Sequence, residues 1–212
     1  TSGRRTLGAM DLQAVLFELD GVLVVTDRYE LQAWHALCRE RSWTFSGRRG
    51  SDSDTLAALL SENGVAEAGV DREELLQEKE HRYLHAVDAM ESEDFFPWAV
   101  GFVIELRAFE IPTAIATRSP GAERVIAAMD MAELFDTIVT GDPREQSAAA
   151  VLKEAVENLG VEPRGVVVFA DGNETLAAAR AAGMTAVGLG PADRVGEANL
   201  AVQNFSDIDF AE

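Results

Sequence analysis

Short apolar runs alternate with amphipathic segments along most of this 212-residue chain. The apolar runs end in turn residues, which predicts buried strands at 13–19, 111–117, 136–140, 165–170 and 185–189. Segments with helical periodicity lie between or after them, at 97–109, 120–129, 145–159 and 174–182. Regular alternation of strand and helix predicts an α/β fold with a Rossmann-like, doubly wound parallel sheet.

A different pattern occupies the stretch that follows the first predicted strand. Residues 29–41, 54–62 and 71–90 read as amphipathic helices with no strand between them. We therefore expect an α/β core at 11–26 and 94–212, and an inserted helical cap subdomain at 27–93. An insertion directly after the first strand of a parallel sheet is expected over the carboxyl ends of the strands, where such sheets bind ligands.

The first ten residues lack periodicity and precede Met10, a candidate natural start. We expect residues 1–10 to be a leader that does not belong to the natural chain. The single cysteine, Cys38, and the lack of a signal-like segment predict a cytoplasmic protein. No apolar stretch reaches the roughly 18 residues of a membrane-spanning helix, so we expect a soluble chain.

The charge of the chain is strongly negative, because 37 acidic residues face 18 basic ones and leave a formal net charge of −19. Such a charge repels nucleic acid phosphates and anionic lipids, and neither kind of partner is expected. It also opposes a small phosphorylated ligand. A site for one would need local positive charge from Lys, Arg, a metal ion or a helix N-terminus.

The most informative motif is AVLFELDGVLVVTDRYELQAWHAL at residues 14–37, in which Glu18, Asp20 and Gly21 follow the first strand. It resembles the opening of phosphatases and phosphomutases of the haloacid dehalogenase (HAD) superfamily, most closely the β-phosphoglucomutase-like subfamily. The resemblance extends to about residue 189. It implies that a first-strand carboxylate attacks phosphorus and that an Asp two residues later handles the leaving-group proton. It also implies a phosphate-binding Lys and a magnesium ion held by carboxylates.

This chain departs from that pattern at the attacking position. Glu18 stands where the family has Asp, and its extra methylene moves the carboxylate by roughly 1.5 Å. A misplacement of about 1 Å can cost about 100-fold in rate. Asp20 keeps the acid/base position. Val25 replaces another Asp, and Glu30 replaces the cap-linker His of the phosphoglucomutases, which argues against mutase chemistry.

The phosphate-binding positions are preserved only in part. The resemblance assigns Thr117, Arg118, Ser119 and Gln146 to them, and Ser119 is expected to cap a helix that starts at Pro120. Gln146 stands where the family has its Lys. The nearest lysine, Lys153, is about two helical turns further on and is expected to face elsewhere.

The last motif, FADGNETLAAARAAGM at residues 169–184, retains Asp171 as a metal-binding acid. The resemblance implies that Ala170 replaces an acidic residue or a glycine, and that Thr175 replaces a second acid common in relatives. The resemblance thus leaves Glu18, Asp171 and Asp20, the last through its carbonyl, as ligands for Mg²⁺. A magnesium ion keeps several waters and needs few protein ligands, so we expect weak or absent binding.

Three hypotheses follow from these residues. The first is a HAD pseudoenzyme that has lost phosphoaspartyl-type catalysis and binds a small phosphorylated metabolite or serves a regulatory role. The second is an active but atypical Mg-dependent phosphohydrolase, and the third is an oligomeric or interaction module that uses the cap. His81 and His85 lie four residues apart, but this spacing is common and does not predict a zinc site. The ligand and the oligomeric state stay open.

Overall fold

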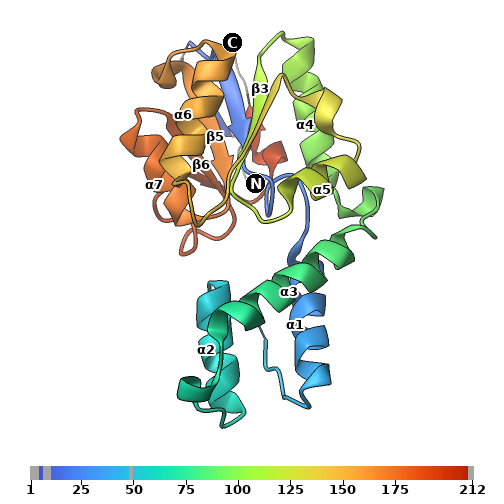
Figure 1. Ribbon diagram of the computed structural model, residues 1–212. Coiled ribbons are helices and arrows are strands. Elements are labelled where there is room, and N and C mark those ends of the chain that lie inside the picture. Colours follow the sequence, from blue (N-terminus) through green and yellow to red (C-terminus); the bar gives the residue numbers. More distant parts are fainter. Residues whose placement is uncertain (1–4, 7–10, 48–49, 210–212) are drawn as a thin grey trace. The chain divides into compact units, whose positions relative to one another are not determined.

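The computed structural model describes residues 5–6, 11–47 and 50–209. The chain forms two compact units, Thr1–Val25 with Glu91–Glu212, and Thr26–Met90. We call them the core unit and the helical unit (Figure 1). The borders expected from the sequence, 26/27 and 93/94, lie one and three residues later than these. The role of the helical unit as a cap stays a prediction.

A parallel sheet forms the centre of the core unit, and its presence confirms the predicted fold class. Its strands are β2 (Ala14–Phe17), β3 (Thr113–Thr117), β4 (Thr137–Thr140), β5 (Val166–Ala170), β6 (Thr185–Leu189) and β7 (Leu200–Val202). Their order is β4-β3-β2-β5-β6-β7, and every neighbouring pair is parallel. The strand β2 is therefore central, with β3 on one side and β5 on the other.

Helices cover both faces of this sheet, as a doubly wound arrangement requires. They are α4 (Pro97–Ala108), α5 (Ala122–Ala128), α6 (Ala148–Leu159) and α7 (Asn173–Ala181). In Figure 1, α6 and α7 lie on one side of the sheet, and α4 and α5 lie on the other. Short 3-10 turns occur at η2 (Ser92–Asp94), η3 (Ala132–Leu134), η4 (Pro163–Gly165) and η5 (Phe205–Asp207).

Alternating residues of β2 pack on opposite faces of the sheet. Phe17 joins an aromatic cluster, in which its ring stacks on that of Phe169 with the centroids 5.4 Å apart. Ala14 and Leu16 instead belong to an aliphatic core that includes residues of α6 and α7. Because side chains alternate along a strand, the next even-numbered position, Glu18, is directed toward the α6 and α7 side. This register places a carboxylate beside α7.

The sequence did not predict the shortest strands. The edge strand β7 has three residues and no alternation that would distinguish it from a loop. A second, two-stranded pairing joins β1 (Arg5–Thr6) to β8 (Ile208–Asp209), so two residues of the expected leader are paired in a strand. Each of these elements depends on a partner that is distant in sequence, and local patterns carry no signal for it.

The helical unit consists of α1 (Asp27–Glu40), α2 (Asp52–Glu62) and α3 (Arg72–Val87), with the 3-10 turn η1 (Glu67–Gly69) between α2 and α3. These match the three predicted cap helices. A capping box starts α2, because the Ser51 side chain accepts from the backbone of Asp54 and the Asp54 carboxylate accepts from the Ser51 backbone. Within the described part of the chain, every helix is too short or too polar to span a bilayer.

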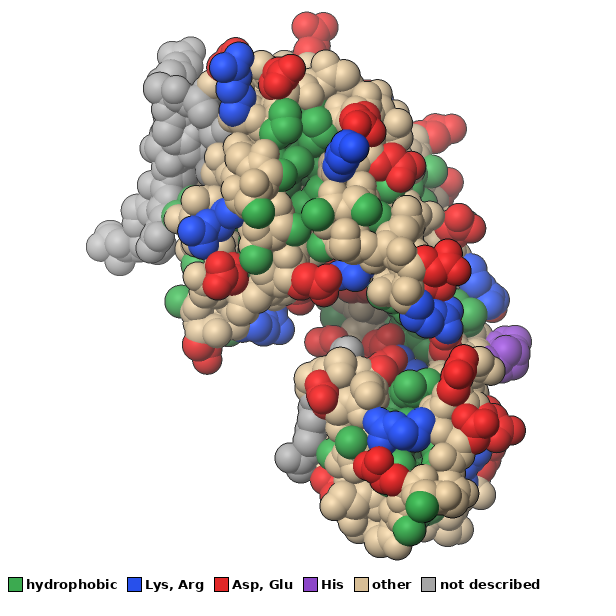
Figure 2. Space-filling model, turned by 60° about the vertical axis from the view of Figure 1, so that its left-hand side comes forward, with side chains coloured by type: hydrophobic (Ala, Val, Ile, Leu, Met, Phe, Trp, Pro, Cys, Tyr) green, Lys and Arg blue, Asp and Glu red, His purple; other side chains and the backbone are tan. Residues whose placement is uncertain are grey.

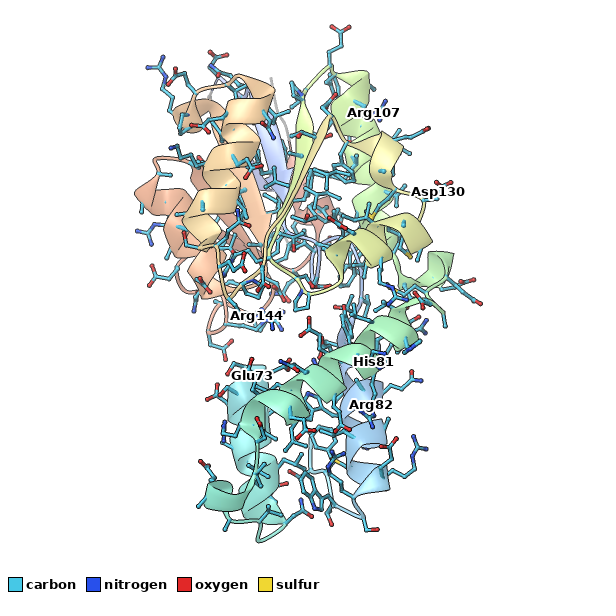
Figure 3. The ribbon with its side chains drawn as sticks, in the orientation of Figure 1. Glu73, His81, Arg82, Arg107, Asp130 and Arg144 are labelled. Carbon is cyan, nitrogen blue, oxygen red and sulfur yellow. The ribbon has the colours of Figure 1, made fainter. Side chains whose placement is uncertain are left out.

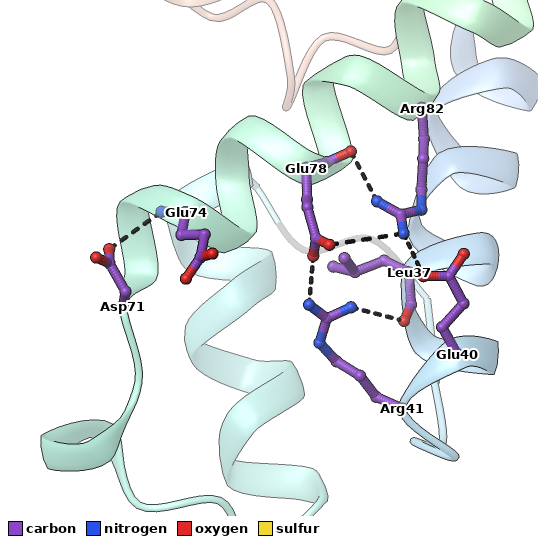
Figure 4. A network of polar contacts seen from close by, with 7 residues as sticks. All are labelled: Leu37, Glu40, Arg41, Asp71, Glu74, Glu78 and Arg82. Carbon is purple, nitrogen blue, oxygen red and sulfur yellow. Dashed lines mark hydrogen bonds and ion pairs between the residues drawn. The ribbon is translucent and has the colours of Figure 1, made fainter.

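Ion pairs on the outside of the helical unit connect α1 with α3 (Figure 4). Glu78 pairs with Arg41, and Arg82 pairs with Glu40. Arg82 also lies 3.8 Å from Glu78 on the same helix. These side chains are partly or largely exposed, and exposed pairs contribute about 0–1 kcal/mol each. We attribute the stability of the unit instead to its apolar core and to one buried charge.

That buried charge is Lys79, whose side chain is 3% exposed. Its Nζ atom forms ion pairs with Glu30 of α1 and, at 2.8 Å, with Asp52 of α2. It also lies 5.7 Å from the ring centroid of Trp34 and 5.3 Å from that of Tyr83. A buried ammonium requires such partners, since desolvation would otherwise favour its neutral form. Lys79 therefore holds the three helices together.

We expect Lys79→Met to lower the free energy of unfolding by about 3 kcal/mol, because it leaves two carboxylates near an apolar core without their cation. Urea unfolding followed by tryptophan fluorescence measures this change. The triple variant Glu30→Gln, Asp52→Asn, Lys79→Met should recover much of the loss. Lys153→Met is the control, since Lys153 is 76% exposed, and its change should stay within about 0.5 kcal/mol. Equal stability of the two single variants would contradict the role of Lys79.

Candidate active site

The carboxyl ends of three neighbouring strands bring most of the predicted site residues to one edge of the sheet. Phe17 of β2 is in register with Ile115 of β3 and with Phe169 of β5. The segments that follow these positions hold Glu18 and Asp20, then Thr117 to Ser119, and then Asp171. Parallel strands end on the same side, so residues far apart in sequence meet there.

Glu18 is largely sheltered at this edge, with its Oε2 atom buried and the residue as a whole partly exposed. Its backbone N–H continues the strand ladder by donating to the Phe169 carbonyl at 2.9 Å. The Thr175 hydroxyl donates to Glu18 Oε1 at 3.2 Å, and the backbone N–H of Asp171 donates to the same carboxylate. Among the described residues, no group hydrogen-bonds to the buried Oε2 atom. The carboxylate is thus held from one side, toward α7.

This environment disfavours the charged form of Glu18. Burial raises the pKa of Glu18 to about 8, and the nearby carboxylates of Asp171 and Asp20 add to the rise. The hydrogen bonds from Thr175 and from the Asp171 backbone oppose it and are too weak to reverse it. In the metal-free protein, this pKa favours a protonated Glu18 at neutral pH.

Gly21 is required by the turn after Asp20. It has a φ of +71°, a conformation that favours glycine. A Cβ atom at this position would lie 2.2 Å from Asp171 Oδ2, so the backbone of the turn packs directly against that carboxylate. Asp171 also lies 3.8 Å from the guanidinium of Arg194, a residue that the sequence did not single out. The two acidic motifs are therefore in contact, as the sequence predicted.

The loop after β3 differs in detail from its prediction. The Ser119 N–H donates to Thr117 Oγ1 at 3.1 Å, and Thr117 is buried. The prediction that Ser119 caps the next helix is wrong. The N-cap of α5 is Gly121, which is left-handed at a φ of 73° and makes no side-chain cap, so the helix begins at Ala122 rather than at Pro120. The left-handed residue delays the start of the helix.

No lysine takes the phosphate-binding position. The side chain of Gln146 folds back on its own loop, where its Oε1 would lie 2.5 Å from a Cβ atom on Gly141. Lys153 is exposed and lies 3.6 Å from Glu157 on the outer face of α6, which confirms that it faces elsewhere. Arg118 instead reaches this region, and its Nη1 donates to the Gln146 carbonyl at 3.3 Å.

The acidic residues at this edge could hold a magnesium ion only if the ion takes few ligands from the protein. No group of three or more His, Cys, Asp or Glu side chains in the described ranges is arranged to hold a metal. The repulsion between Glu18 and Asp171, together with the buried Oε2 of Glu18, still favours a cation between them. Mg²⁺ commonly uses one or two carboxylates and retains water. Glu18 and Asp171 therefore suit such an ion. His81 and His85 are exposed on α3, with ring centroids 4.6 Å apart. Figure 3 labels His81.

Two functional contacts were not predicted. Thr175 was identified as a replaced acid, but its bond to Glu18 was not foreseen. Glu174, at the start of α7, pairs with Arg118 at 2.7 Å. The strand alternation that directs Glu18 toward α7 was a usable signal for the first contact. The second depends on how far an arginine side chain reaches across the strand ends, and no pattern in the sequence indicates that.

The comparison with known proteins agrees with this geometry. The family model for haloacid dehalogenase-like hydrolases matches residues 15–189, and the chain belongs to this family. Its members typically use Mg²⁺. The β-phosphoglucomutase of Bacillus subtilis (strain 168) is 24% identical, over 93% of this chain and 92% of its own length. The fructose-1-phosphate phosphatase YqaB of Escherichia coli (strain K12) is 26% identical, over 82% and 94%.

Solved structures show the same fold. The β-phosphoglucomutase of Clostridium difficile superposes with a TM-score of 0.74 at 22% identity and covers 94% of each chain. A predicted phosphoglycolate phosphatase of Haemophilus somnus 129PT gives a TM-score of 0.76 at 16% identity, with 94% of this chain and 97% of the other covered. The architecture is therefore that of HAD phosphatases and mutases.

We expect Glu18→Gln to stabilise the metal-free protein at pH 8 by on the order of 3 kcal/mol and to leave it unchanged near pH 4.5. Below pH 4.5, Glu18 is protonated in both states. As the pH rises toward 8, the unfolded state ionises first, so the native protein loses stability that the glutamine variant keeps. Thermal unfolding in EDTA measures the difference. The exposed Glu154→Gln serves as the control, and a gain for Glu18→Gln that is constant with pH would contradict this assignment.

Proposed function

We propose that this HAD-family protein binds a small phosphorylated metabolite and has lost phosphoaspartyl-type catalysis. The observation that carries the proposal is the position of Glu18, whose Oε2 atom is buried and whose Oε1 atom accepts from the Thr175 hydroxyl at 3.2 Å. Burial of this group raises its pKa to about 8, which favours the protonated form in the metal-free protein. A protonated carboxyl group is a poor nucleophile. The longer side chain also displaces its oxygens from the position of an aspartate, and in-line attack tolerates little displacement.

The binding part of the proposal depends on the loop after β3. Thr117 and Ser119 keep hydroxyl and amide groups at the strand end, and Arg118 brings a guanidinium to the same edge. A bound magnesium ion would supply charge neutralisation for the phosphoryl oxygens. Asp171 and Glu18 are the residues that would hold it, and Glu18 would release its proton when the ion binds. The names of the relatives refer to sugar phosphates, which makes these compounds the first ligands to test.

We expect no magnesium-dependent phosphate release from glucose 1-phosphate, glucose 6-phosphate or fructose 1-phosphate above about 1 s⁻¹, a modest value for enzymes. Phosphate release and ligand binding are measured on the same preparation. A bound sugar phosphate without turnover supports the proposal. Turnover above this rate would overturn the loss of catalysis, and failure of every sugar phosphate tested to bind would overturn the binding role.

A second function, an atypical magnesium-dependent phosphohydrolase, is favoured by one observation. The pKa of Glu18, at about 8, lies near the working pH, which suits a general acid or base. In this reading Glu18 takes a proton from an attacking water, and Asp20 donates a proton to the leaving group. The second reading therefore requires both carboxyl groups.

If turnover is found, Glu18→Gln and Asp20→Asn should each reduce kcat by at least about 100-fold, as removal of a general acid or base does. Steady-state phosphate release measures this, with Glu154→Gln as the unaffected variant. An unchanged rate in either site variant removes the second function.

A further inference from the structure

The guanidinium of Arg118 crosses the carboxyl end of the central strand. Arg118 follows β3, its Nη1 donates to the Gln146 carbonyl after β4, and its Nη2 lies 2.7 Å from Glu174 Oε2 on the helix after β5. In the strand order β4-β3-β2-β5, the side chain of Arg118 thus joins loops from both sides of β2. Glu18 and Asp20 follow β2. Arg118 is the cation that these contacts carry across this edge, while Arg194, which is 56% exposed, lies 3.8 Å from Asp171.

The surroundings of Arg118 are negative. Glu18, Asp20 and Asp171 lie near one another at the strand ends, as their mutual effect on Glu18 indicates. Acidic side chains are also spread over the face of the core unit that Figure 2 shows. A phosphomonoester dianion would be repelled here unless a cation lies within hydrogen-bond reach. The Arg118 side chain is 17% exposed. Water therefore screens its electrostatic interactions only weakly, and a ligand can still reach it.

We propose that Arg118 binds the phosphoryl oxygens of the ligand in place of the missing lysine, and that Glu174 competes with the ligand for it. This inference rests on the proposed binding function and names its cation. The planar guanidinium binds phosphate oxygens in a bidentate fashion, with charge-assisted hydrogen bonds. The bond to the Gln146 carbonyl keeps the guanidinium in place when Glu174 leaves.

Glu174 is suited to be displaced. Its side chain is 68% exposed, so it loses little when it turns into solvent. A phosphomonoester carries up to two negative charges against one on the carboxylate, and Arg118 gains from the exchange. The ion pair with Glu174 therefore holds Arg118 ready without blocking it. The same ion pair lowers the affinity of Arg118 for an anionic ligand.

The test uses inorganic phosphate as the probe and the full chain as the protein, at constant ionic strength and with magnesium present. Binding is followed by phosphorus NMR. Arg118→Met should weaken phosphate binding by about 10- to 100-fold, the loss expected for hydrogen bonds to a charged group. Arg144→Met is the matched control, because Arg144 is 64% exposed in the neighbouring loop and pairs with Asp142 two residues before it (Figure 3). It should bind phosphate as the parent chain does.

The variant Glu174→Gln tests whether Glu174 competes with the ligand for Arg118. Position 174 is exposed, so the fold tolerates the change. It should tighten phosphate binding by about 3-fold or more, because the competing charge is gone. Equal affinity of Arg118→Met and the parent chain would overturn the inference while leaving the binding function intact. Weaker binding by Glu174→Gln would overturn the competition. No phosphate binding by the parent chain, at any concentration tested, would overturn both the proposed function and the inference.

Discussion

A buried carboxyl group at the end of the central strand is the constraint on which this site depends. Glu18 emerges from β2 toward α7, where burial removes most of its solvation. An isolated carboxylate in such a place is costly, and the fold reduces the cost by hydrogen bonds and by protonation. The Thr175 hydroxyl and the Asp171 amide supply the bonds. Neutral Glu18 is then compatible with the acids around it.

The two departures at Glu18 and Thr175 belong together. They lie 157 residues apart, yet their side chains share a hydrogen bond. An acid at position 175 would place a further negative charge against Glu18 and would raise its pKa still more. A hydroxyl group instead donates to the longer carboxylate. The two residues therefore act as a pair, in which the Thr175 hydroxyl stabilises the longer carboxyl group that stands at position 18.

Sequence patterns predicted the sheet, its helices and the acidic strand ends, because each depends on periodicity and local turn residues. The same patterns could not predict contacts made by long side chains. Arg118 bridges Gln146 and Glu174 only once β3, β4 and α7 are in place. Similarly, the amphipathic pattern of residues 71–90 predicted α3, but its buried Lys79 needs carboxylates from two other helices. Local pattern carries no information on such pairings.

Both units use scarce positive charge in the same way. In the helical unit Lys79 is balanced by Glu30 and Asp52, and in the core unit Arg118 is shared between Glu174 and a carbonyl. The net charge of the chain is −19, and both of these cations already have an internal acidic partner. An anionic ligand must therefore exchange places with a carboxylate. Exchange is easy at an exposed acid such as Glu174 and costly at a buried pair such as Lys79, so the fold itself selects which cation can bind a ligand.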